Sequence, residues 1–162
     1  MSKLLIIDDD PIYQSTAQLI LSKNMLFDDC TSYTDAKLAL NYLIVHRHNR
    51  DALPDVIFVN LNMPGMGGWN FLCLHEDLLP FLAKKIDVFI VTSSDDRKDE
   101  SRSQAYPFVK GFYSKPLNLT ELLDISNYVT ATAMKYDYLK QLATVQSDSL
   151  AELSNQAEVQ KE

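Results

Sequence analysis

Short apolar runs that end in polar residues recur along the first two thirds of the chain. Residues 4–7 read Leu-Leu-Ile-Ile and stop at three aspartates, and residues 56–59 read Val-Ile-Phe-Val and stop at Asn60. Unbroken apolar runs of this length are typical of strands that are buried on both faces of a parallel sheet. Together with three similar runs, the pattern predicts strands at 3–7, 27–33, 55–59, 86–91 and 109–113.

Helical patterns separate these runs. Asp10 followed by Pro11 is typical of a helix cap and a first helical residue, and Thr34 or Asp35 can cap a second helix. Further helices are expected from about 69, 95 and 118. Strand and helix thus alternate five times, which predicts an α/β fold: a doubly wound, parallel five-stranded sheet with helices on both faces.

Polar side chains follow four of the predicted strands. In such sheets the functional site lies beyond the carboxyl ends of the strands, so these side chains are expected to meet at one edge. They are two carboxylates, an amide, two hydroxyls and an ammonium group: Asp8, Asp9, Asn60, Thr92, Ser93 and Lys115.

Composition limits the classes of function. The net charge of −7 argues against nucleic-acid binding, which needs clustered Lys and Arg. No apolar run approaches the roughly 20 residues of a membrane span, and the N-terminus does not resemble a signal peptide. Cys30 and Cys73 fit no zinc spacing and suit a reducing compartment, so a cytoplasmic protein is expected.

Residues 134–162 differ from the rest, since they contain neither Pro nor Gly and are rich in helix-forming residues. We therefore divide the chain into a domain at 1–133 and an extension at 134–162. Leu139, Leu142 and Leu153 favour an extended fifth helix that contacts a partner, whereas the many polar residues favour a solvated tail. Both interpretations stay open.

Four motifs, in order, resemble the receiver domains of response regulators. They are 6–11 (IIDDDP), 60–69 (NLNMPGMGGW), 91–93 (VTS) and Lys115-Pro116, and the resemblance covers about residues 3–130. The segment from Asn62 to Trp69 is most similar to stand-alone receivers. The resemblance implies a flavodoxin-like fold and a role in two-component phosphorelay signalling. The implied partner is a histidine kinase or another signalling protein, and neither nucleic acid nor a membrane is expected as a partner. Whether two copies of the chain form a dimer is left open.

The resemblance also implies roles for single residues. Asp8 and Asp9 would hold Mg²⁺ with the backbone carbonyl of Asn62, as suits a hard cation that prefers oxygen ligands. Thr92 and Lys115 would contact a phosphoryl group. Phe112 occupies the position of an aromatic residue whose packing follows the switch state of the family.

Asn60 departs from the family, which has a nucleophilic aspartate at this position. An amide is a far poorer nucleophile than a carboxylate, so we expect a signalling module that is not phosphorylated and not an enzyme. Asn60 would be a weak metal ligand, so Mg²⁺ is a candidate cofactor with reduced affinity. Two alternatives remain: a conventional phosphoacceptor, if Asn60 replaces a natural aspartate by engineering, and an unrelated Mg²⁺-dependent phosphohydrolase.

Two residues carry weaker expectations. His75 lies on the third predicted helix without a catalytic partner, and we expect it at the surface. Gly67 can adopt positive φ, which favours a loop at that position.

Overall fold

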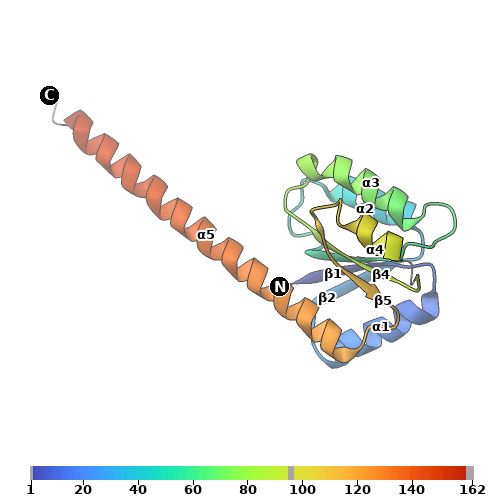
Figure 1. The fold of residues 1–162 in the computed structure, drawn as a ribbon. Helices are drawn as coiled ribbons and strands as arrows, with labels where there is room; N and C mark the ends of the chain where they lie inside the picture. The colour runs from blue at the N-terminus through green and yellow to red at the C-terminus, as the bar shows by residue number, and fades with distance from the viewer. Residues whose placement is uncertain (1, 95–96, 160–162) are drawn as a thin grey trace. The chain divides into compact units, whose positions relative to one another are not determined.

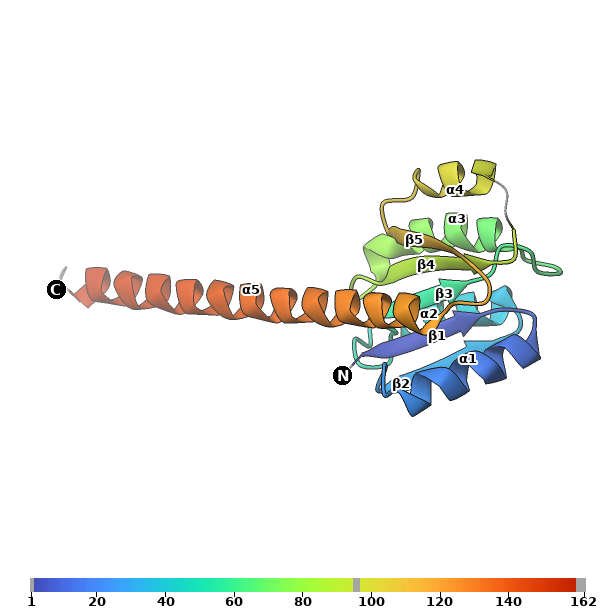
Figure 2. The same ribbon diagram turned by 60° about the horizontal axis from the view of Figure 1, so that its bottom comes forward.

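The computed structural model describes residues 2–94 and 97–159, with side chains described as far as 144. Five parallel strands form one sheet in the order β2-β1-β3-β4-β5 (Figure 2). The apolar runs β3 and β4 are buried along their whole length, as their composition predicts. The strands are β1 (Lys3–Ile7), β2 (Asp29–Tyr33), β3 (Val56–Val59), β4 (Asp87–Thr92) and β5 (Val109–Ser114).

Helices cover both faces of this sheet (Figure 1). α1 and the first turns of α5 lie on one face, and α2, α3 and α4 lie on the other. The predicted doubly wound α/β fold is therefore confirmed. The helices are α1 (Pro11–Lys23), α2 (Ala36–His46), α3 (Gly68–Leu78), the 3-10 helix η1 (Leu79–Phe81), α4 (Arg97–Ser103) and α5 (Leu119–Val159).

Two aspartates fix the starts of α1 and α2. The Asp10 carboxylate accepts hydrogen bonds from the backbone N–H groups of Ile12 and Tyr13, at 2.9 and 3.1 Å. Asp35, rather than Thr34, caps α2 by accepting from the backbone of Lys37 at 2.8 Å. These caps satisfy N–H groups that a helix leaves without intrahelical partners, so each helix begins at a fixed point after its strand.

In the loop between β3 and α3, the glycine that adopts positive φ is Gly65. Gly65 adopts φ of 74°, while Gly67 has φ of −69° and precedes the first residue of α3. Gly67 thus lies in a loop, as expected, but the positive φ that a glycine permits is used at Gly65 and not at Gly67. Gly68 is required for another reason: a Cβ there would lie 2.3 Å from the backbone oxygen of Asn60.

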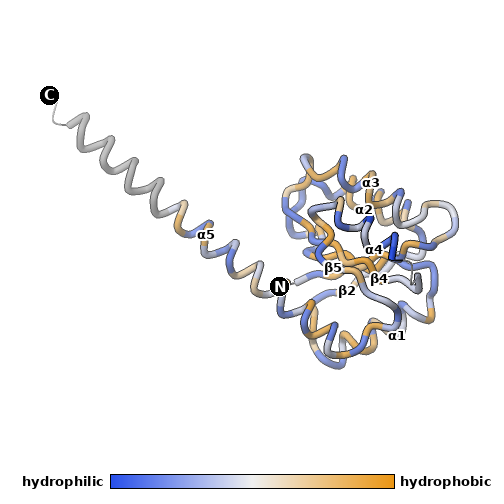
Figure 3. The backbone as a smooth tube through the Cα atoms, in the orientation of Figure 1, coloured by the Kyte–Doolittle hydropathy of each residue, from blue (hydrophilic) through white to orange (hydrophobic). Residues whose placement is uncertain are grey.

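Apolar side chains from the strands and from α2 and α3 pack into one core, and the most hydrophobic segments follow the central strands (Figure 3). His75 belongs to this core. It is fully buried, stacked on Phe71 with ring centroids 5.7 Å apart and edge-on to Phe108 at 5.1 Å. The expectation that His75 lies at the surface is therefore wrong, because its position on α3 faces the sheet.

The chain divides into two compact units, Met1–Ser126 and Asn127–Glu162. The second unit consists of the continuation of α5, whose backbone stays helical through Val159. The extended C-terminal helix is thus confirmed. Within the described ranges, no helix combines the length and apolarity that crossing a membrane requires.

Candidate functional site

Asp8 follows β1 directly and is 1% exposed. Its carboxylate accepts a hydrogen bond from the backbone N–H of Asp10 at 3.1 Å and forms an ion pair with the ammonium group of Lys115. Burial raises the pKa of Asp8, and the hydrogen bond from Lys115 opposes this rise. The ion pair thus joins the end of β1 to the segment that follows β5.

Lys115 is held from three sides. Its backbone N–H donates to the carbonyl of Thr92 at 2.9 Å, which ties the end of β5 to the end of β4. Its ammonium group contacts Asp8 and lies 4.4 Å from the centroid of the Tyr13 ring on α1. Because a cation over an aromatic face is attracted to it, Tyr13 helps to fix the position of Lys115. No pattern in the sequence predicts this role of Tyr13.

Asn60 lies at the end of β3 and is 5% exposed. Its side-chain nitrogen donates two hydrogen bonds of 3.0 Å, one to a carboxylate oxygen of Asp9 and one to the backbone carbonyl of Asn62. The side-chain oxygen Oδ1 is buried and has no hydrogen-bond partner among the described residues. The amide is therefore oriented by its two donor contacts.

Thr92 connects the site to α3 and α4. It is fully buried, and its hydroxyl accepts a hydrogen bond from the backbone of Ser94 at 3.3 Å. The Ser94 hydroxyl donates to Asp99 at 2.9 Å, and Asp99 also accepts from the indole N–H of Trp69 at 3.2 Å. The guanidinium of Arg102 lies 4.1 Å from the centroid of the Trp69 ring. Sequence reasoning missed this network, because Trp69 lies 30 residues before Asp99 in the chain and no local pattern links them.

Two further residues frame the site. Gln14 on α1 is buried and donates to the backbone carbonyls of Asp8 and Tyr33, at 2.7 and 2.8 Å, so it ties the end of β1 to the end of β2. Phe112 on β5 is half-buried and packs against the apolar core. Ser93 is exposed and takes no part in the contacts described above.

Most of the oxygen atoms that would suit Mg²⁺ are paired with N–H donors: both oxygens of Asp8, one oxygen of Asp9 and the carbonyl of Asn62. Asp9 and the Asn62 carbonyl both accept from the Asn60 amide, and Asp8 is engaged with Lys115. The Asn60 side chain thus presents N–H donors, and not an oxygen, to Asp9 and to the Asn62 carbonyl, which are two of the groups that would hold Mg²⁺ in a receiver. This arrangement does not fit bound Mg²⁺, and the described residues contain no group of three or more His, Cys, Asp or Glu side chains suited to a metal.

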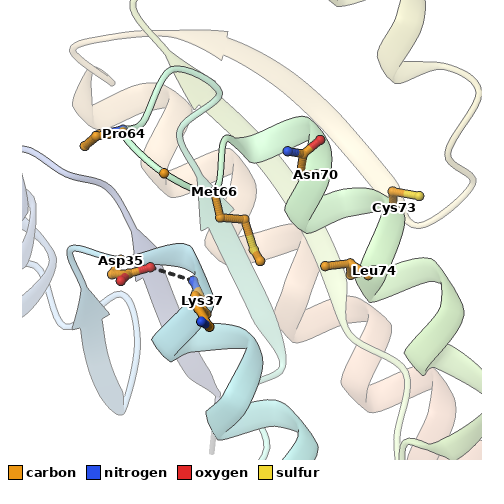
Figure 4. A pocket seen from close by; sticks show the side chains of 8 residues that line it. Asp35, Lys37, Pro64, Met66, Asn70, Cys73 and Leu74 are labelled. Carbon is orange, nitrogen blue, oxygen red and sulfur yellow. Dashed lines mark hydrogen bonds between the residues drawn. The ribbon is translucent and has the colours of Figure 1, made fainter.

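A groove of about 640 Å³ lies beside the loop between β3 and α3 (Figure 4). It includes none of the polar residues that meet at the strand ends. Its lining is mixed, with an exposed thiol and apolar side chains next to the start of α2: Asp35, Lys37, Pro64, Gly65, Met66, Asn70, Cys73 and Leu74.

A parallel five-stranded sheet in the order 2-1-3-4-5, with a carboxylate pair, a hydroxyl and a lysine at its carboxyl edge, defines the flavodoxin-like receiver class. The family model of the response regulator receiver domain matches residues 4–127, so the chain belongs to this family. Receiver domains are modules of two-component signal transduction. No curated protein matches the chain.

Solved structures agree with this assignment. A two-component response regulator from Cytophaga hutchinsonii is 28% identical, with a TM-score of 0.70 over 81% of this chain and 98% of its own. A receiver protein from Dyadobacter fermentans is 24% identical, with a TM-score of 0.68 over 80% of this chain and 98% of its own. The chemotaxis protein CheY4 of Vibrio cholerae is 22% identical, with a TM-score of 0.62 over 80% and 98%. The last two likenesses establish the fold alone.

Proposed function

We propose that this receiver signals by docking to other proteins and does not accept phosphate, because Asn60 stands where the family has its phosphoacceptor aspartate. One observation carries the proposal: the Asn60 amide donates hydrogen bonds to both Asp9 and the Asn62 carbonyl. The nitrogen is thus paired with two of the oxygen-bearing groups that would hold Mg²⁺ in a phosphorylated receiver.

The chemistry of the site supports this proposal. Phosphorylation of a receiver requires a carboxylate that attacks phosphorus, and an amide has neither the charge nor the nucleophilicity. The three ionisable groups Asp8, Asp9 and Lys115 carry a net charge of −1, whereas an aspartate at position 60 would make it −2. One amide N–H of Asn60 donates to the Asp9 carboxylate, so this carboxylate has a partner that does not depend on Mg²⁺.

α1 supplies a docking surface. Ile12 is 77% exposed and Leu19 is 53% exposed, and residues seven apart lie on the same face of a helix. Ile12 follows the aspartates of the site by only a few residues. An apolar pair next to a charged edge suits contact with the helices of a histidine kinase or with another signalling protein.

Intact-protein mass spectrometry tests the assignment of Asn60. The chain and the variant Asn60→Asp are incubated with Mg²⁺ and acetyl phosphate, and Asn62→Asp serves as a matched control that adds a carboxylate two residues away. We expect one added phosphoryl group on Asn60→Asp and none on the other two. Phosphate on the unsubstituted chain at this site would refute the proposal and favour a conventional phosphoacceptor.

A metal titration tests the second part of the proposal. Trp69 is the only tryptophan and its indole is linked through Asp99 and Ser94 to Thr92, so its fluorescence should report binding at the site. We expect Asn60→Asp to bind Mg²⁺ about tenfold more tightly or better, since one added charge close to the cation contributes on the order of 1–4 kcal/mol. Equal affinity of the two proteins would contradict the idea that the Asn60 amide replaces the cation.

A further inference from the structure

The second unit exposes apolar side chains on α5. Leu139 and Leu142 are 53% and 44% exposed, and apolar segments lie among the last turns of this helix that carry colour in Figure 3. The helix continues to Val159, and two more leucines follow at 150 and 153. Isolated helices in water are marginal, and most helical stability in proteins comes from packing an apolar face. A helix of 41 residues with a stripe of such side chains therefore calls for a partner.

The stripe has an unusual symmetry. Leu139 and Leu150 are eleven residues apart, as are Leu142 and Leu153, and eleven residues complete about three helical turns. All four positions therefore share one face of the helix. Gln146 lies on the same face at the midpoint, so the spacing along the stripe reads 3, 4, 4, 3 in both directions.

We propose that the occupant of this stripe is a second copy of the chain, bound antiparallel around a two-fold axis at Gln146. In that register Leu142 faces the partner's Leu150, and Leu139 faces the partner's Leu153. An interface between identical chains must be self-complementary, and a stripe that reads the same in both directions meets this condition. The proposal does not depend on the function proposed for Asn60.

The charges of the two halves of the helix favour the antiparallel orientation. Residues 127–144 carry Lys135 and Lys140 against Asp137, a net charge of +1. Residues 145–159 carry three acids and no lysine or arginine, a net charge of −3. Parallel helices would place the two acidic halves side by side, whereas antiparallel helices place each acidic half beside the basic half of its partner. Opposite charges beside the apolar seam set the orientation of paired helices.

Gln146 gives the pairing a fixed register. A single polar residue in an otherwise apolar seam specifies the alignment of two helices, because any shift leaves it facing an apolar side chain. At the two-fold axis Gln146 meets the partner's Gln146, and an amide both donates and accepts hydrogen bonds. The seam from 139 to 153 lies wholly within the second unit, so the pairing uses no surface of the receiver fold.

Sedimentation velocity of the full chain, over a range of concentrations, tests whether the dimer forms. We expect a dimer, and we expect Leu142→Lys to raise its dissociation constant about a hundredfold. Each dimer loses two buried leucines, and the loss of each changes the constant about tenfold. Gln141→Lys is the matched control, because it adds the same charge to an exposed position on the other side of the helix. A monomer at every concentration, or a dimer that Leu142→Lys leaves intact, would overturn the proposal.

Disulfide mapping tests the orientation. Chains with Leu142→Cys and with Leu150→Cys are mixed, oxidised and digested, and the unsubstituted chain measures the background from Cys30 and Cys73. The antiparallel register predicts a link between positions 142 and 150 of different chains, and little linkage in either variant alone. Preferential linkage of 142 to 142 would show parallel helices and refute the arrangement around Gln146.

Discussion

His75 provides a test of how far burial alone controls the stability of this fold. The imidazole is fully buried between Phe71 and Phe108, and neither ring nitrogen has a hydrogen-bond partner in the described part of the chain. Burial lowers the pKa of His75 from 6.5 to about 4, because the apolar surroundings disfavour the charged form. The folded protein therefore holds this histidine neutral at pH values where the unfolded chain protonates it.

The direction of the pH effect follows from this difference. Between pH 6.5 and about 4 the unfolded chain binds a proton at His75 that the folded chain does not, so stability falls as pH falls through this window. Above pH 6.5 His75 causes no loss of unfolding free energy, and below about pH 4 the loss reaches its full size. Each pKa unit corresponds to about 1.4 kcal/mol, which gives a total loss of about 3 kcal/mol.

The variant His75→Leu removes the titrating group. We expect its free energy of unfolding at pH 7 to lie within about 1 kcal/mol of the original, since losing two unpaired buried nitrogens offsets the lost aromatic contacts. At pH 4 it should be more stable than the unsubstituted chain by about 3 kcal/mol. Asp8, whose raised pKa has the opposite effect on acidification, is present in both proteins and cancels in the comparison.

Urea unfolding from pH 4 to 8 measures this difference. The exposed His48 is the control position, and His48→Leu should retain the pH profile of the unsubstituted chain. Parallel profiles for His75→Leu and the original would show that His75 is hydrated or paired in solution and would refute the reasoning.

Two further predictions concern the frame of the site. Lys115→Met should reduce the free energy of unfolding in urea by about 3 kcal/mol, because it leaves the buried Asp8 carboxylate without its cation, and adding Asp8→Asn should restore much of the loss. If the double variant did not recover unfolding free energy, the result would argue against the ion pair. Gly68→Ala should lower Tm clearly more than Gly67→Ala, since its Cβ would lie 2.3 Å from the Asn60 backbone oxygen, against 3.3 Å to the nearest atom at Gly67; equal effects would contradict the close approach.

The sequence predicts the frame of this molecule well because apolar runs and caps are local signals. The limits of β1 match the run at 3–7, and Asp10 caps α1 as its position before Pro11 indicates. The convergence of Asp8 and Lys115 also follows from the pattern, since parallel strands place their carboxyl ends at one edge. A few local features and one rule of topology are thus enough to assemble most of the site.

Contacts between distant residues escaped prediction because no local pattern encodes them. His75 was expected at the surface, and only the packing of α3 against the sheet shows that its side chain replaces an apolar residue in the core. The loop predicted at Gly67 is present, but the sequence does not tell which glycine adopts positive φ, because Gly65 and Gly67 both suit a turn and only the three-dimensional path selects Gly65. The network from Thr92 through Asp99 to Trp69 likewise requires side-chain geometry.

Asn60 combines a feature that the sequence shows, its amide side chain, with contacts that only the structure shows. In the function that we propose, this amide stands in the place of the family's carboxylate, and in the structure its nitrogen donates hydrogen bonds to Asp9 and to the backbone carbonyl of Asn62. The cost of this arrangement is one buried oxygen without a partner on Asn60 itself. An aspartate at this position would reverse both effects, since its oxygens would face the Asp9 carboxylate and raise the demand for Mg²⁺. In the function that we propose, independence of Mg²⁺ and loss of the nucleophile would both follow from the same amide.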